Sequence, residues 1–119
     1  MKTKKTIVAT AIGLAAFVDT QAAQVYTPAF YDISRIGSYS TLFPPDSTLQ
    51  GFTRVFFAQP LVWTAGTCEA GSVLIRAEDK TLLASAQIAF ASGRTVQVFA
   101  EDSFPKPYGL CVLTYIQYQ

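Results

Sequence analysis

The sequence predicts a mainly β protein with one helix. Short β-branched and aromatic runs recur along the chain, and turn residues such as Gly and Pro separate them. One stretch, Asp79–Ser92 (DKTLLASAQIAFAS), instead has apolar residues at helical spacing. The chain has 119 residues, of which 50% are apolar, so its length and composition fit a single globular domain.

The predicted strands are rich in β-branched and aromatic residues. They span Phe30–Tyr39, Phe52–Phe57, Ser72–Arg76, Thr95–Glu101 and Leu110–Tyr118. Leu61–Trp63 follows a proline and is expected to resume pairing at a sheet edge. Gln24–Ala29 is expected to be an irregular lead-in. Ser40–Gly51, which contains adjacent prolines, is expected to be a loop.

The predicted helix has one apolar face. Its members are Leu82, Leu83, Ala86, Ala89 and Phe90. Glu78 and Asp79 precede it, where acidic residues cap the positive end, and Gly93 follows it, where a left-handed residue ends a helix. The resulting order is strand, strand, strand, helix, strand, strand. This order predicts an OB-fold-like five-stranded barrel, with a small sheet crossed by one helix as the alternative.

Residues 1–22 have the layout of a secretory signal peptide, which leaves residues 23–119 as the mature domain. Three lysines precede thirteen uncharged, mostly apolar residues, and small residues follow them. Thirteen residues are too few to span a bilayer, which needs about 20. Cleavage is expected after Ala22, with Ala23 as the alternative. The product is therefore expected to be secreted or periplasmic, without a membrane span once the signal is removed.

The composition excludes several classes of function. Without the signal, the chain keeps six basic and seven acidic residues, so neither a nucleic-acid partner nor electrostatic membrane docking is expected. There is no His, which excludes a serine triad and every His-containing metal site. No loop repeats the acidic ligands of a calcium site. We therefore expect no enzyme activity, no catalytic residues, no metal and no cofactor.

Cys68 and Cys111 are the only cysteines. In an oxidising compartment, an even pair in so small a domain predicts a disulfide bond. The alternative, a redox role, lacks a C-x-x-C motif. Closing a loop of about 44 residues is worth about 4 kcal/mol on a chain-entropy estimate.

Aromatic side chains are the best candidates for a binding surface. The chain has nine Phe, six Tyr and one Trp, more than a small barrel buries. Candidate ligand or interface residues are Phe43, Trp63, Phe104 and Tyr108, because exposed aromatic rings suit sugar stacking or protein contacts. The alternative is a core rich in Phe with Tyr at its rim. The last predicted strand is apolar on both faces, which favours a subunit contact.

The stretch Thr81–Ala100 (TLLASAQIAFASGRTVQVFA) resembles a segment in the B subunits of subtilase-cytotoxin-like and pertussis-like toxins. In those proteins a helix ends in a Ser/Thr-Gly-Gln type turn before a strand, and Ser92-Gly93-Arg94 takes that place here. The layout of Cys68–Tyr118 also resembles small exported bacterial proteins. The resemblance implies an OB-fold and a ring of subunits. No glycan-binding residue is carried over, because Gln24–Ser40 does not align with the sugar-binding motif of those toxins.

Two functions follow. The first is an exported, non-enzymatic binding protein, a homo-oligomer that recognises a glycan or a protein receptor in the manner of a toxin B subunit. The second is a monomeric periplasmic envelope protein or enzyme inhibitor, which inserts a loop such as Phe43–Ser47 into a cleft of its target.

Overall fold

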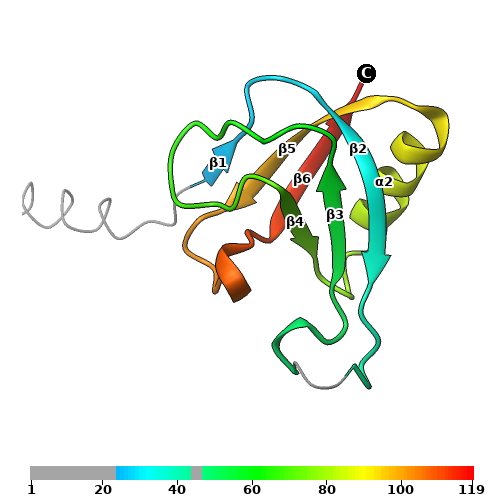
Figure 1. Ribbon diagram of the computed structural model, residues 1–119, viewed down its shortest axis with the longest axis vertical. Helices are drawn as coiled ribbons and strands as arrows, with labels where there is room; N and C mark the ends of the chain where they lie inside the picture. The colour runs from blue at the N-terminus through cyan, green and yellow to red at the C-terminus, as the bar shows by residue number, and fades with distance from the viewer. Residues whose placement is uncertain (1–23, 44–46) are drawn as a thin grey trace, which may run out of the picture.

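The computed structural model describes residues 24–43 and 47–119 (Figure 1). The predicted signal peptide lies outside these residues, as do residues 44–46 of the predicted loop. The elements, in chain order, are β1 Gln24–Tyr26, β2 Tyr31–Ser38, η1 Ser47–Leu49, β3 Thr53–Phe57, β4 Ser72–Ile75, α2 Lys80–Ser92, β5 Thr95–Glu101, η2 Pro107–Gly109 and β6 Leu113–Tyr118. The fold is thus mainly β with one α-helix, as predicted.

The strands form one curled antiparallel sheet. β5 pairs with β6 along one side, and with β1 and the start of β2 along the other. β2 continues to β3, and β3 to β4. A parallel bridge between Leu74 and Val112 then joins β4 to the segment before β6, and the N–H of Leu74 donates to the carbonyl of Cys111 at 2.9 Å. The sheet therefore curls into a half-barrel (Figure 1).

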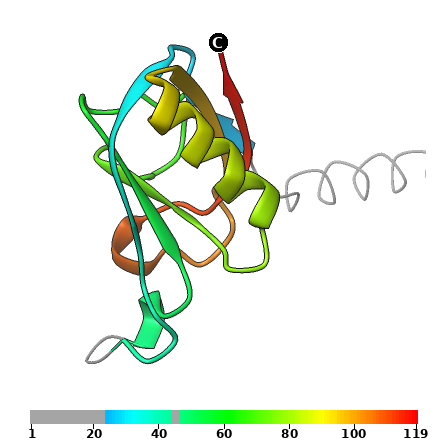
Figure 2. The ribbon, with the colours of Figure 1, turned by 90° about the vertical axis from the view of Figure 1, so that its right-hand side faces the viewer.

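The core lies inside this curl and is closed by α2. Alternate residues of β5, namely Val96, Val98 and Ala100, point into it and are fully buried, as the predicted alternation requires. α2 packs against β2, β5 and β6 across one side of the sheet (Figure 2). Its buried residues are Ala86 and Ala89, whose small side chains let the helix approach the strands closely.

The ends of α2 follow the prediction only in part. Gly93 adopts the left-handed conformation (φ 70°), and its N–H donates to the carbonyl of Phe90, which ends the helix. Asp79 occupies the N-cap position but makes no side-chain cap bond, because its carboxylate accepts hydrogen bonds from Arg76 instead. Phe90 was expected on the buried face and is 44% exposed, since Ala86 and Ala89 define the line of closest contact.

Two of the predicted segments have a different secondary structure, and the last predicted strand begins later than expected. Gln24–Tyr26 is a strand rather than an irregular lead-in, because the buried Val25 anchors it beside β5. Leu61–Trp63 is not a strand: Leu61 is buried and its N–H donates to the carbonyl of Ala70 at 2.7 Å within a loop.

The last strand begins at Leu113, not Leu110. Leu110 and Val112 are buried in a small second cluster with Leu49 and Leu74, whereas Cys111 belongs to the main core. The apolar residues before β6 therefore have partners within the monomer and are not evidence for a subunit contact. Among the described residues, no helix has the length and hydropathy needed to cross a bilayer.

Candidate functional site

An open pocket of about 660 Å³ lies between the loop that joins β2 to β3 and the loop that joins β5 to β6. Its lining residues are Thr48, Phe52, Arg76, Phe104, Pro105, Lys106, Pro107 and Val112. They come from η1, the approach to β3, the end of β4 and the β5–β6 loop (Figure 1). The size is within the range of about 300–1,000 Å³ typical of ligand sites.

The β2–β3 loop is held at its base by backbone hydrogen bonds. The N–H of Tyr39 donates to the carbonyl of Phe52 at 2.8 Å, and the N–H of Gly51 donates to the carbonyl of Tyr39 at 2.9 Å. Gly51 has φ 83°, a conformation that favours glycine. Leu49 of this loop is buried against Val112 in the second cluster. One side of the pocket is therefore fixed to the barrel through packing.

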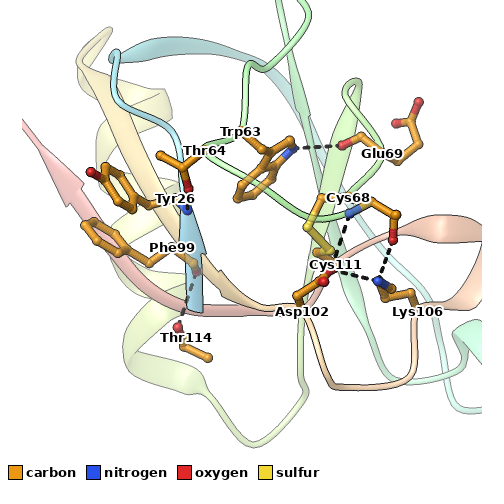
Figure 3. Close-up of a disulfide and its surroundings, with 11 residues drawn as sticks. Tyr26, Trp63, Thr64, Cys68, Glu69, Phe99, Asp102, Lys106, Cys111 and Thr114 are labelled. Carbon is orange, nitrogen blue, oxygen red and sulfur yellow. Dashed lines mark hydrogen bonds and ion pairs between the residues drawn. A yellow bond between two sulfur atoms is a disulfide. The ribbon is translucent and has the colours of Figure 1, made fainter. Parts of the chain in front are cut away.

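The β5–β6 loop is fixed by an ion pair and by the disulfide (Figure 3). Lys106 Nζ donates to Asp102 Oδ1 and to Thr67 Oγ1, both at 2.7 Å. The hydrogen bond from Lys106 is the main reason that the pKa of Asp102 lies below its usual value. Cys68 and Cys111 form the predicted disulfide, with Cα atoms 5.3 Å apart. The ion pair lies within the β5–β6 loop, whereas the hydrogen bond from Lys106 to Thr67 and the disulfide join this loop to the segment between β3 and β4.

Asp102 lies close enough to both sulfur atoms to suggest a metal site. The carboxylate and the two Sγ atoms are all within 4.8 Å of one another. The sulfur atoms are bonded to each other, however, so neither is the thiolate that a metal ion requires. In the oxidised protein, Asp102 and the Cys68–Cys111 disulfide therefore hold the β5–β6 loop in position and do not form a metal centre.

Arg76 contributes the second cation of the pocket wall, and it too is paired. Its Nε lies 3.1 Å from Asp79 Oδ2, its Nη2 lies 3.4 Å from Asp79 Oδ1, and its Nη1 lies 3.8 Å from Glu78 Oε2. The hydrogen bond and charge of Asp79 raise the pKa of Arg76. The pocket is therefore mainly apolar, with two cations whose charges are already balanced.

The four predicted aromatic residues do not form one site. Phe104 lines the pocket. Tyr108 lies in the same loop and is 70% exposed, with φ 56°, but its side chain is not part of the lining. Trp63 packs against the main core, and its Nε1 donates to the carbonyl of Glu69 at 3.2 Å. Phe43 makes an edge contact with Tyr39, with ring centroids 4.9 Å apart.

Sequence reasoning missed the other pocket residues, among them Phe52, Arg76 and Val112. Phe52 was assigned to a strand and Arg76 to the end of one, and neither position indicates that a loop from elsewhere in the chain lies opposite. The two prolines beside Phe104 were the one local signal, because they predict a fixed turn that exposes its neighbours.

A second group of aromatic residues lies on the outer face of the sheet. Tyr26 stacks on Phe99 with ring centroids 5.0 Å apart, and Phe99 makes an edge contact with Tyr115 at 5.2 Å. Figure 3 shows Tyr26 and Phe99 pointing away from Trp63 and the disulfide. Their alignment depends on the pairing of β1, β5 and β6, which the sequence alone does not specify. We call this group the outer aromatic row.

Comparison of the chain with protein-family models, curated proteins and solved structures gives no match.

Proposed function

We propose that the chain is an exported, non-enzymatic binding protein with an OB-fold, and that it recognises its partner through the pocket between the β2–β3 and β5–β6 loops. The observation that carries this proposal is the pocket itself. Phe52, Phe104 and two prolines line it, and the ion pair, the disulfide and the second cluster hold its loops in position. Rigid loops on a barrel are a common basis for recognition.

The pairing of the strands supports the OB-fold part of the proposal. β1 and β2 together act as the first barrel strand, which pairs with β3 and β5. β4 meets the segment before β6 in parallel, and α2 lies between β4 and β5 in the chain. In OB-folds the loop after the first strand and the loop before the last strand flank the ligand-binding face. In this chain those two positions correspond to the β2–β3 loop and the β5–β6 loop, which form the pocket.

The disulfide supports export, because such bonds persist in oxidising compartments and are rare elsewhere. Oligomerisation in the manner of a toxin B subunit is supported by the outer aromatic row, since exposed rings without charge are typical of subunit contacts. Light scattering behind size exclusion on the oxidised mature protein tests this point. A multiple of the protomer mass is expected, and a monomer at all concentrations would contradict the ring.

A monomeric envelope protein or enzyme inhibitor is the second candidate. It is favoured by Leu42, which is 82% exposed on the β2–β3 loop, a loop that projects beyond the barrel (Figure 1). An inhibitor of this kind would insert the loop into a cleft of its target. Replacing Leu42 with Ser should then abolish capture of the target. Phe104→Ala, which changes the pocket and not this loop, should leave capture intact.

The decisive experiment compares matched variants in a glycan array and in pull-downs from envelope extract. Phe104→Ala removes a ring from the pocket, and Phe90→Ala removes a 44% exposed ring from α2, outside both the pocket and the outer aromatic row. The proposal predicts that a partner bound by the wild-type protein is lost with Phe104→Ala and retained by Phe90→Ala. Absence of any partner in both assays, or equal binding by Phe104→Ala, would contradict it.

A further inference from the structure

Two arginines share one aromatic ring on the outer face of β2 and β3. The two strands run side by side (Figure 1), and Arg35 of β2 pairs with Phe56 of β3. Arg54 lies two residues before Phe56, so both side chains are on the face opposite to the buried Val55. The guanidinium carbon of Arg35 lies 4.0 Å from the centre of the Phe56 ring, and that of Arg54 lies 4.7 Å from it.

The charge of this arginine pair is not balanced, unlike that of the cations beside the pocket. Arg76 and Lys106 each form an ion pair with a carboxylate. No carboxylate in the described part of the chain forms an ion pair with Arg35 or Arg54. Long side chains at diagonal positions of neighbouring strands reach each other, and like charges there repel. An anion that accepts hydrogen bonds from both guanidinium groups removes this repulsion.

The guanidinium group of Arg54 is held in one orientation. Its Nε donates to Ser72 Oγ at 2.9 Å, and its Nη1 donates to the hydroxyl of Tyr39 at 3.5 Å. Ser72 is buried in β4, and Tyr39 packs against the second cluster. Most of the five N–H groups of this arginine remain for a ligand. An orientation that is fixed in advance lowers the entropy cost of binding.

Open space lies next to both arginines at Gly37. This residue pairs with Arg54 and is on the same face of β2 as Arg35. No atom lies within 4 Å of the position that a Cβ of Gly37 would occupy. The backbone does not require glycine here, because φ of Gly37 lies outside the left-handed region. The missing side chain therefore leaves room for a ligand beside the two cations.

We propose that Arg35 and Arg54 form a binding site for one oxyanion, a carboxylate or phosphate group with at least two acceptor oxygens. Planar guanidinium groups donate paired N–H bonds to such a group, and the open space at Gly37 admits it. These residues do not line the pocket, so the site goes beyond the proposed function. Two arginines on one ring serve a single oxyanion, not the extended basic face that a nucleic acid requires.

The test is titration of the oxidised protein with three probes, followed by the Nε–H NMR signals of Arg35 and Arg54. Inorganic phosphate represents a free oxyanion, methyl β-glucuronide represents a carboxylate on a sugar, and methyl β-glucoside is the same sugar without charge. We expect phosphate and the glucuronide to shift both signals with dissociation constants of about 1 mM or tighter. The neutral glucoside should leave them unchanged. Tighter binding of the glucuronide than of phosphate identifies an oxyanion carried on a sugar, and the reverse order identifies a phosphate group.

Two variants and a matched control test the physical reasons. Arg54→Gln should weaken phosphate binding about tenfold, because charge-assisted hydrogen bonds are lost. Gly37→Val keeps both arginines and suits a strand, but its side chain fills the open space and should weaken binding by a similar factor. Arg94→Gln is the control, because Arg94 also lies over a ring, that of Tyr118 at 5.5 Å, without a second described cation on it. This change should leave phosphate binding unaltered.

The proposal is overturned if neither phosphate nor the glucuronide shifts the signals at millimolar concentration, or if the neutral glucoside shifts them equally. It is also overturned if Gly37→Val binds phosphate like the wild-type protein, or if Arg94→Gln weakens binding as much as Arg54→Gln does. Failure of the pocket proposal is a separate result, since Phe104→Ala should not change phosphate binding. Phosphate binding without any captured partner would retain the oxyanion site and reject the recognition pocket.

Discussion

Reduction of the Cys68–Cys111 disulfide is expected to lower the free energy of unfolding by about 4 kcal/mol. The two cysteines are 43 residues apart in sequence, so the bond removes a large loop entropy from the unfolded chain. The reduced native state has no new cavity, because no atoms are deleted. Domains of this size have net stabilities of about 5–15 kcal/mol, so the loss takes a large share of the total.

The assay is urea unfolding of the oxidised and reduced wild-type protein, followed by the fluorescence of Trp63. With a slope of about 1–3 kcal/mol per molar urea, the midpoint should fall by about 1.3–4 M. The pocket is expected to weaken as well, because the disulfide joins the β5–β6 loop region to the segment between β3 and β4. A midpoint shift below about 0.5 M would refute the argument from loop entropy.

The remaining predictions concern charge, helix termination and packing. Lys106 lowers the pKa of Asp102, so the pair stabilises the fold above the unfolded-state pKa of the carboxyl group. This stabilisation is lost as pH falls through the folded-state value, and the stability difference between wild type and Asp102→Asn should vanish in acid. Gly93→Ala should destabilise by about 1 kcal/mol in thermal unfolding, because a residue with a Cβ is strained at φ 70°. Nothing lies within 4 Å of the added Cβ, so no clash adds to this cost and no new contact offsets it; an unchanged melting temperature would contradict the prediction. Ala86→Leu should destabilise by about 1–3 kcal/mol through overpacking, whereas the exposed control Ala84→Leu should not.

Local patterns explain which parts of the fold could be predicted. The strict alternation of Thr95–Glu101 reproduces the bounds of β5, and helical spacing with Gly93 predicts α2 to within one residue at its start. Such signals depend only on neighbours in the chain. The strand at Gln24–Tyr26 was missed because three residues carry no periodicity, and its stability comes from pairing with β5.

The pocket could not be predicted for the same reason. Phe52, Arg76 and Phe104 are far apart in the sequence, and they meet only because the sheet curls and the β5–β6 loop returns over the end of β4. The prolines near Tyr108 predict that its side chain is exposed, as it is. No comparable signal predicts how far Trp63 is buried. That side chain is half-buried, because its ring packs on the core while its indole N–H bonds to a loop carbonyl.

The most direct test of the account is the affinity of a captured partner for the wild-type protein and for the Phe104→Ala and Phe90→Ala variants. The account predicts at least about a tenfold loss for Phe104→Ala and no change for Phe90→Ala. Equal affinity for wild type and Phe104→Ala, or a loss confined to Phe90→Ala, would contradict the claim that this pocket is the recognition site.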